Sequence, residues 1–373
     1  MAQVQTFEQK ESRPPPLRET GAWQWAREHL FGSYINTAVT LLSLYFLYLI
    51  VPPIVEWGIL QANIEGADRS VCEANPDGAC WTFIKVRFNQ IMFGLYFGAN
   101  PEQVWRPALA MFVFAGLIAW LVVPRTPFKP QVALGTLVGF PIFTYAVVQG
   151  ELLGLPAANV TEWGGFLLTL TLASVGIVAA LPIGIILALG RRSELPIIRA
   201  LSIVYIEFWR GTPLITILFM ASVMLPLFFP AEMDFNKILR AMVGITLFQS
   251  AYTAEAVRGG LQAMPRGQYE AADALGLGYW KKMIFIILPQ SLRISIPGIV
   301  NTFIALFKDT SLVSIIGLLD LLNMAQTASR SIEWKGYDFE AYIFAAFIFF
   351  MCTYGMSRYS QYIERKLDRE TQR

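Results

Sequence analysis

Charged and amide side chains interrupt the long apolar stretches of this sequence at three places, and these are the residues best placed to bind a solute. They are Arg210, the adjacent pair Lys308 and Asp309, and Gln249. Charge inside a hydrocarbon layer is unfavourable, so an intramembrane ionisable residue is by default a candidate functional site. Asp309 can meet an ammonium group, and Lys308 or Arg210 can meet a carboxylate, so the set suits a zwitterion such as an amino acid.

Arg210 is followed by residues that break helices. Pro213 removes a backbone donor and its ring clashes with the carbonyl of Trp209, while Gly211 loosens the same turn. We therefore expect a kinked or broken helix, and irregular backbone persists at membrane depth only beside a cavity or buried protein. The guanidinium suits bidentate binding of a carboxylate. The alternative is a structural pair with Glu207, one helical turn earlier.

Lys308, Asp309 and Gln249 each have a structural alternative as well. Adjacent helical residues point roughly 100° apart, so Lys308 and Asp309 need not pair with each other, although an ion pair at a helix end remains open. The amide of Gln249 lies in the middle of an apolar run and must face protein or a cavity. It either contacts the solute or only hydrogen-bonds a neighbouring helix.

No residues of the sequence form a recognisable catalytic or cofactor site. The sequence lacks a phosphate-binding Gly-x4-Gly-Lys-Ser/Thr loop, a His-Glu-x2-His pair and a Gly-x-Ser-x-Gly elbow. One His and three Cys leave little material for a metal site. We therefore expect neither a metal, nor a cofactor, nor enzymatic activity. A net charge of only +2 argues against nucleic acid as a partner.

A polar segment, residues 266–290, separates two long apolar runs, and the rest of the chain is organised around it. Its charges cannot cross lipid, so it must lie outside the bilayer. The Ala-rich stretch 268–275 favours a helix, and Gly276 follows where a left-handed C-terminal cap is required. A second short helix should start near Tyr279 and end at Pro289. The segment is thus predicted to be a helix–turn–helix on the membrane surface.

The same segment carries a specific resemblance to a known family. Its pattern consists of Glu270, Ala271 and Ala272, then Gly276, and then Ile286, Leu288 and Pro289. This pattern resembles the signature loop of the membrane subunits of binding-protein-dependent ABC importers. The flanking segments 208–214, 252–260 and 308–312 are similar to those of the polar amino-acid permease subfamily, the histidine/glutamine/arginine type. With its N-terminal extension, the whole chain resembles the M-type permease subunit of general L-amino-acid importers.

The resemblance implies a permease subunit that moves L-amino acids across the inner membrane of a Gram-negative bacterium by alternating access. Implied partners are an ABC ATPase dimer, which binds the ATP, a periplasmic substrate-binding protein and a second, homologous permease that forms a heterodimer with this chain. The implied ATPase-coupling residues are Glu270, Ala271, Ala272 and Gly276, because an exposed Glu beside small Ala side chains suits insertion into a groove of the ATPase. The alternative is a surface helix that rests on lipid.

Composition and apolar runs place the chain in the membrane. Of its 373 residues, 55% are hydrophobic and only 15% are charged, whereas ordinary soluble domains carry about 25% charged residues. Eight runs approach the roughly 20 residues that a helix needs to cross a bilayer. We expect an all-α, multi-pass membrane protein with both termini in the cytoplasm, because Lys and Arg concentrate in the loops on that side. The runs are 34–55, 107–123, 132–149, 164–190, 203–228, 239–257, 292–316 and 341–356.

The runs divide the chain into two predicted regions. Residues 1–160 form an N-terminal arm and a three-span extension. Residues 161–373 form a five-span core, which the resemblance identifies with the type I ABC importer permease fold and which contains the cytoplasmic coupling loop 258–290. The external loop of the extension contains Cys72 and Cys80, which either pair as a disulfide or remain free thiols.

Three other functions stay open at this point. A membrane enzyme acting on lipid-soluble substrates would need convergent acid and base groups, which the apolar runs scarcely offer. An ATP-independent transporter or channel would move the solute without a partner. Within the same family, the solute would be another small polar molecule such as an opine.

Overall fold

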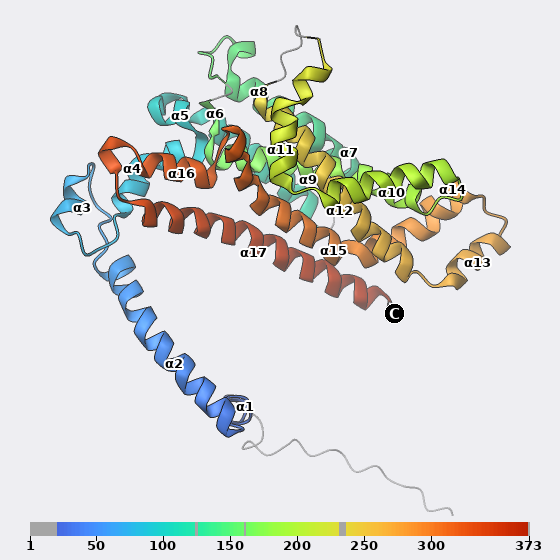
Figure 1. The fold of residues 1–373 in the computed structure, drawn as a ribbon, viewed down its shortest axis with the longest axis horizontal. Coiled ribbons are helices and arrows are strands. Elements are labelled where there is room, and N and C mark those ends of the chain that lie inside the picture. The colour runs from blue at the N-terminus through green and yellow to red at the C-terminus, as the bar shows by residue number, and fades with distance from the viewer. Residues whose placement is uncertain (1–20, 124–125, 160–161, 231–235, 372–373) are drawn as a thin grey trace, which may run out of the picture. The chain divides into compact units, whose positions relative to one another are not determined.

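The computed structural model describes residues 21–123, 126–159, 162–230 and 236–371, which are almost entirely helical (Figure 1). The predicted all-α class is confirmed. The predicted N-terminal arm begins with residues 1–20, which lie outside the described residues.

Contacts between residues divide the chain into two compact units. One consists of residues 1–65 and 70–79, and the other, called the core unit below, consists of residues 66–69 and 80–373. Much of the predicted extension therefore packs within the same unit as the predicted five-span core. The predicted boundary near residue 160 is based on the resemblance to a family fold and not on how the chain packs. This boundary stays a prediction.

One long apolar helix, α2, dominates the first unit. The elements of this unit are α1 (Ala22–His29), α2 (Tyr34–Val55), η1 (Glu56–Leu60) and α3 (Ser70–Ala74). Ser33 starts α2 by accepting a hydrogen bond from the backbone N–H of Asn36 at 3.1 Å. No side chain of α2 is buried, and the stretch Tyr34–Leu60 is long and apolar enough to cross a bilayer. The surface of α2 therefore suits lipid.

The core unit begins with the part of the predicted extension that follows Ala79. Its helices are α4 (Trp81–Phe93), α5 (Leu95–Ala99), η2 (Pro101–Gln103), α6 (Trp105–Val122), α7 (Lys129–Leu134), η3 (Gly135–Gly139), α8 (Phe140–Gln149) and η4 (Glu151–Leu153). The predicted run 132–149 is divided among α7, the π-helical η3 and α8, and both α7 and α8 pack beside α6.

A close backbone contact ties α4 to the first helix of the predicted five-span core. Gly165 begins α9 with φ +64°, and a Cβ atom there would lie 2.1 Å from the backbone oxygen of Ile91. Only glycine combines this left-handed conformation with such an approach. The extension and the five-span region are therefore joined through main-chain atoms as well as through side chains.

The remaining helices of the core unit surround α12, which contacts α9 and α15 most extensively (Figure 1). Small residues bring these helices close, because a Cβ atom at Gly184 of α9 would lie 2.8 Å from Cβ of Thr253 in α12. The elements are α9 (Gly165–Arg191), α10 (Pro196–Gly211), α11 (Leu214–Val223), η6 (Leu225–Phe228), α12 (Lys237–Ala263), α13 (Arg266–Ala274), α14 (Tyr279–Lys282), η7 (Met283–Ile287), α15 (Leu288–Asp309), η8 (Thr310–Ile316), β1 (Leu319–Asp320), α16 (Leu321–Ser329), η9 (Ile332–Trp334) and α17 (Asp338–Thr371).

A bend of 103° separates α10 from α11, at the place where the sequence predicts a broken helix. Thr212 is extended, with φ −101° and ψ 129°, because a proline such as Pro213 pushes the preceding residue out of the α region. The predicted break is confirmed. The run 203–228 is therefore not one straight span.

By length and composition, five helices of the described residues can cross a membrane, or six if the bent pair counts as one span. The run 239–257 also folds as a helix, but α12 carries charged side chains such as Glu255. The expected count of eight spans stays a prediction. The five are Tyr34–Leu60, Pro101–Leu121, Gly165–Arg191, Tyr279–Ile316 and Asp338–Lys366.

A fully buried carboxyl group starts α16. Asp320 accepts hydrogen bonds from the backbone N–H groups of Leu322 and Asn323, both at 3.2 Å, as an N-cap residue does. Burial raises the pKa of Asp320, and the hydrogen bonds from Asn323 and Leu322 oppose that rise. The buried carboxylate of Asp320 thus fixes the start of α16 through N-cap hydrogen bonds.

Candidate functional site

The polar segment after α12 folds as the sequence predicts, and its cap is resolved in detail. α13 ends at Ala274, and Gly276 is left-handed with φ +69°. The N–H of Leu277 donates to the oxygen of Ala272 at 3.2 Å, and the N–H of Gly276 donates to that of Asp273 at 2.9 Å. These two bonds form a Schellman motif. The predicted left-handed cap at Gly276 is confirmed.

The side chains of α13 divide between an exposed and a buried face. Glu270 and Ala271 are exposed, whereas Ala272 is only 1% exposed and faces the protein. Within the described part of the chain, Glu270 makes no ion pair. Asp273 instead pairs with Lys282 of α14 at 2.5 Å, which closes the turn. Glu270 and Ala271 therefore present a free acidic face, and Ala272 anchors the helix beneath it.

The second helix of this segment differs from the prediction. It starts at Tyr279 as expected, but Pro289 does not end it, because α14 continues through the π-helical η7 into α15. Pro289 lies in the first turn of α15, where a missing N–H is tolerated. The N–H of Leu288 reaches back to the oxygen of Met283, and this wider turn leaves room for the ring. The polar segment 266–290 is thus continuous with α15, which belongs to a stretch long and apolar enough to cross a membrane.

Arg192, which the sequence analysis did not single out, links α9 to α13. Its Nη1 donates to the backbone oxygen of Leu261 at 2.8 Å and to the hydroxyl of Tyr269 at 3.0 Å. Its guanidinium also lies 5.5 Å from the centre of the Tyr269 ring, a cation–π distance. In the sequence, the position of Arg192 after an apolar run indicated only that the residue belongs to a cytoplasmic loop.

Arg210 belongs to a network of five charged side chains around Glu255. The Glu255 carboxylate contacts Arg258 at 2.6 Å, Arg191 at 2.8 Å and Arg210 at 3.6 Å, and Arg191 also pairs with Glu207 at 2.9 Å. The alternative of a Glu207–Arg210 pair is thus replaced by a wider arrangement from α9, α10 and α12. Because three guanidinium groups face two carboxylates, the network carries a positive charge beside the break after α10.

Arg210 is the most exposed of the three arginines in this network. Its side chain is 36% exposed, compared with 14% for Glu255. It also lies over the ring of Tyr252, with 5.5 Å between the guanidinium and the ring centre. A carboxylate that approaches Arg210 therefore competes with a contact of 3.6 Å, the longest in the network.

Gln249 is enclosed between helices. It is 2% exposed, and its Nε2 has no hydrogen-bond partner among the described residues. Ile245 and Thr253 lie one turn before and after it on the same face of α12, and they pack against Gly176 and Gly184 of α9. The Gln249 amide therefore lies between α12 and α9.

Lys308 and Asp309 lie at the C-terminal end of α15, far along the core unit from the network around Glu255. Gly298 of α15 packs beside Ala256, the residue after Glu255. Lys308 follows roughly three turns later, about 15 Å along the helix axis. Lys308 is exposed and Asp309 is half-buried, and within the described chain they form no ion pair with each other. The structure therefore does not join Arg210, Gln249 and the Lys308–Asp309 pair into one site.

The cysteines fall into two classes. Cys352 is a free thiol, whereas Cys72 and Cys80 are buried and disulfide-bonded. Disulfides persist in oxidising compartments, so thiol labelling before and after reduction of the purified protein tests the predicted external loop.

The sequence is similar to that of known transport proteins over nearly its whole length. Residues 180–369 match the family described as binding-protein-dependent transport system inner membrane component. The inner membrane amino-acid ABC transporter permease protein YhdY of Escherichia coli K12 is 48% identical, and the match covers 95% of this chain and 96% of YhdY.

Two further relatives differ from each other in length. The glutamate/glutamine/aspartate/asparagine transport system permease protein BztC of Rhodobacter capsulatus is 40% identical over 96% of both chains. The probable glutamine ABC transporter permease protein GlnP of Bacillus subtilis is 34% identical, over 54% of this chain and 91% of its own. Such permeases therefore exist in a long form, which includes the counterpart of nearly this whole chain, and in a short form.

Proposed function

This chain belongs to the family of binding-protein-dependent transport system inner membrane components, and from that membership we propose that it is a permease subunit that carries L-amino acids. As a member of this family it is a multi-pass inner-membrane transporter subunit and not itself an enzyme. The amino-acid substrate is supported by the names of the long relatives YhdY and BztC. An ATPase and a substrate-binding protein are the partners that the family implies.

The exposed face of α13 is the observation that carries the proposal. Glu270 and Ala271 are exposed, and Glu270 forms no ion pair among the described residues. A free carboxylate on a short, capped helix suits a basic groove of the ATPase, which binds and hydrolyses the ATP. Ala272 and Gly276 shape this helix, one by burial and the other by the left-handed cap.

Movement of α13 has a direct route to the break between α10 and α11. Tyr269 of α13 holds Arg192, and the neighbouring Arg191 binds Glu207 and Glu255. Closure of the ATPases would shift α13, pull the end of α9 and loosen the network in which Arg210 lies. Alternating access then follows from a rearrangement of α10 against α12.

The substrate contacts form two stations in this mechanism. Lys308 and Asp309 offer opposite charges at the end remote from α13, where a zwitterion arriving from outside would meet them first. Arg210 then takes the carboxylate when its contact with Glu255 is released. Gln249 contacts substrate only if α9 and α12 separate, because it is buried between them. A second, homologous permease completes the pathway as a heterodimer.

The decisive experiment combines assembly and uptake. Glu270→Lys should prevent the ATPase from copurifying with the permease and should abolish ATP-driven uptake of L-amino acids into proteoliposomes, while membrane insertion stays intact. Glu194→Lys is the matched control, because it reverses an exposed charge in the loop between α9 and α10. Normal assembly of the Glu270→Lys complex would remove the docking role.

The same assay separates the remaining alternatives. Uptake by the wild-type complex without nucleotide would establish ATP-independent transport and overturn the importer. ATP-driven uptake of a different polar solute, with no uptake of amino acids, would retain the importer and correct the substrate.

A further inference from the structure

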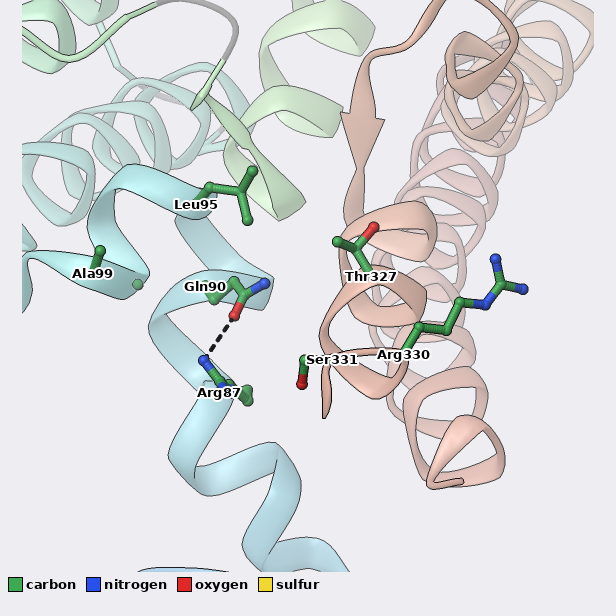
Figure 2. Close-up of a pocket in the computed structure, with 8 residues that line it drawn as sticks. Arg87, Gln90, Leu95, Ala99, Thr327, Arg330 and Ser331 are labelled. Atoms are coloured by element: carbon green, nitrogen blue, oxygen red, sulfur yellow. Dashed lines mark hydrogen bonds between the residues drawn. The ribbon is translucent and has the colours of Figure 1, made fainter. Parts of the chain in front are cut away.

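A pocket of about 690 Å³ opens between the extension and α16 (Figure 2). One wall comes from α4 and α5, and the other comes from the end of α16 and the residue that follows it. Its lining residues are Arg87, Gln90, Leu95, Gly98, Ala99, Thr327, Arg330 and Ser331.

The pocket lies at the end of the core unit opposite the coupling segment. α15 runs from that segment to η8, and α17 returns in the opposite direction, so α16 lies at their far end (Figure 1). The inference therefore rests on the proposed function, in which α13 is cytoplasmic. In that orientation the pocket faces the compartment of the substrate-binding protein.

Gln90 supplies a buried donor that is turned into the pocket. Its Oε1 accepts a hydrogen bond from Arg87 at 3.4 Å, which fixes the orientation of the amide. Figure 2 shows the nitrogen of Gln90 turned toward α16. Gln90 is only 8% exposed, and among the described residues its Nε2 has no hydrogen-bond partner. Such a donor favours an incoming oxygen acceptor.

The two arginines of the pocket are in different states. Arg87 is held by the carboxylate of Glu333 and by Gln90. Arg330 is exposed, and its side chain forms no ion pair or hydrogen bond with the described residues. In Figure 2 it extends from α16 away from Arg87. Arg330 is thus a free cation at the rim, and Gln90 is a free donor in the wall.

The surroundings favour a protein rather than a free amino acid as the occupant. No carboxylate lines the pocket, and the nearby Glu333 is already bound to Arg87, so a substrate ammonium group would find no free partner there. Ile332, two residues after Arg330 and directly before Glu333, is 96% exposed. Arginine is one of the residues that most often anchor protein interfaces, and an exposed arginine without a partner such as Arg330 suits that role.

We propose that this pocket receives an acidic side chain of the periplasmic substrate-binding protein. Gln90 donates to the carboxylate from the wall, Arg330 binds it from the rim once its guanidinium turns toward α4, and Ile332 packs against the docked surface. Because α4 and α5 form one wall, the N-terminal extension is part of the receptor for the binding protein. This assigns the extension a role that the short permeases must fill differently.

The test uses the complete importer in nanodiscs, with its own substrate-binding protein saturated with a mixture of L-amino acids. The Kd of the binding protein is measured together with basal and stimulated ATP hydrolysis. Arg330→Glu should raise the Kd at least tenfold, while subunit assembly and basal hydrolysis stay unchanged. Lys335→Glu, the same charge reversal in the same loop but outside the pocket, should change the Kd less than twofold. Arg330→Gln should weaken binding by a smaller factor.

Several outcomes would overturn the proposal. An unchanged Kd for Arg330→Glu would exclude the pocket as a docking site. Equal effects of Arg330→Glu and Lys335→Glu would show that only the overall surface charge attracts the binding protein. An unchanged Kd combined with lost dependence on phosphatidylglycerol in the nanodisc would assign Arg330 to lipid headgroups instead. If no binding protein stimulates the wild-type complex, the proposed function itself fails. Normal stimulation of both wild type and Arg330→Glu defeats this inference alone.

Discussion

The two ends of the core unit differ in how extensively their charged side chains are joined to one another. At the end that carries α13, charges from α9, α10 and α12 bind one another around Glu255, and Arg192 joins the end of α9 to Tyr269 of α13. At the end that carries α16, Arg87 pairs with Glu333, but Lys308 and Arg330 are exposed and form no ion pair among the described residues. Charges paired within the chain can pass on a movement, whereas charges left open can receive a solute or a protein.

The largest effect is expected from removing the carboxylate of Glu255, which lies at the centre of the ion-pair network. Glu255→Gln leaves three guanidinium groups without their shared carboxylate, and breaking a buried pair costs about 3–5 kcal/mol. Because this network is partly exposed, we expect a loss of about 2 kcal/mol in the free energy of unfolding. Uptake should fall at least about tenfold, because the network no longer joins α10 to α12 and a rise of about 1.4 kcal/mol in the barrier to transport is one decade in rate. Thermal unfolding and proteoliposome uptake measure both effects.

The matching control for that substitution is Glu194→Gln. The carboxylate of Glu194 is exposed in the loop after α9, and its loss should leave stability and uptake within experimental error. If Glu255→Gln behaves like Glu194→Gln, the network does not connect the helices, and the contrast between the two ends disappears.

A smaller effect should follow from disturbing the left-handed turn at Gly276 that ends α13. Gly276→Val forces a β-branched residue into a left-handed conformation, which costs about 1–2 kcal/mol. The turn should refold locally and misplace Glu270, so ATP hydrolysis should continue while uptake per ATP falls several-fold. The ratio of uptake to phosphate release in the same vesicles measures this uncoupling.

Gly278 provides a control two residues away. Its φ is −63°, and a Cβ atom there would meet no atom within 4 Å. Gly278→Val should therefore retain wild-type coupling. Equal losses from the two substitutions would show that the loop tolerates no bulk at all, and that the cap at Gly276 is not the cause.

The smallest effect is expected from removing a single hydrogen bond, the one between Arg192 and Tyr269. Tyr269→Phe removes the hydroxyl that accepts from Arg192 but keeps the ring beneath the guanidinium. Loss of one such bond is worth about 1 kcal/mol, so coupling should fall about two- to fivefold. Tyr279→Phe, at an exposed position of α14, should change nothing. Full coupling in Tyr269→Phe would exclude this hydroxyl from the route between α13 and α9.

Features governed by local rules could be predicted from the sequence. The left-handed cap at Gly276 follows from an Ala-rich helix that meets a glycine, and the bend near Pro213 follows from a missing donor and a restricted neighbour. Both depend on residues within one helical turn. The all-α membrane class likewise follows from composition and from the length of the apolar runs.

Features that depend on the meeting of distant segments could not be predicted. The partners of Glu255 come from helices separated by dozens of residues, so the spacing around Arg210 suggested only Glu207. The link between Arg192 and Tyr269 has no sequence signal beyond a basic loop. The error at Pro289 had a different cause, because a π-helical turn accommodates a proline that an ordinary helix interior excludes.

That wide turn, η7, has an implication for how such importers diversify. A π-helical turn holds an additional residue compared with a regular helix, and each residue corresponds to about 100° of rotation. A single-codon deletion there would restore regular winding and leave the flanking helices intact, yet it would aim Glu270 in a new direction. During evolution a permease could in this way come to fit an ATPase of a different shape, while the contacting surfaces of both proteins stay unchanged.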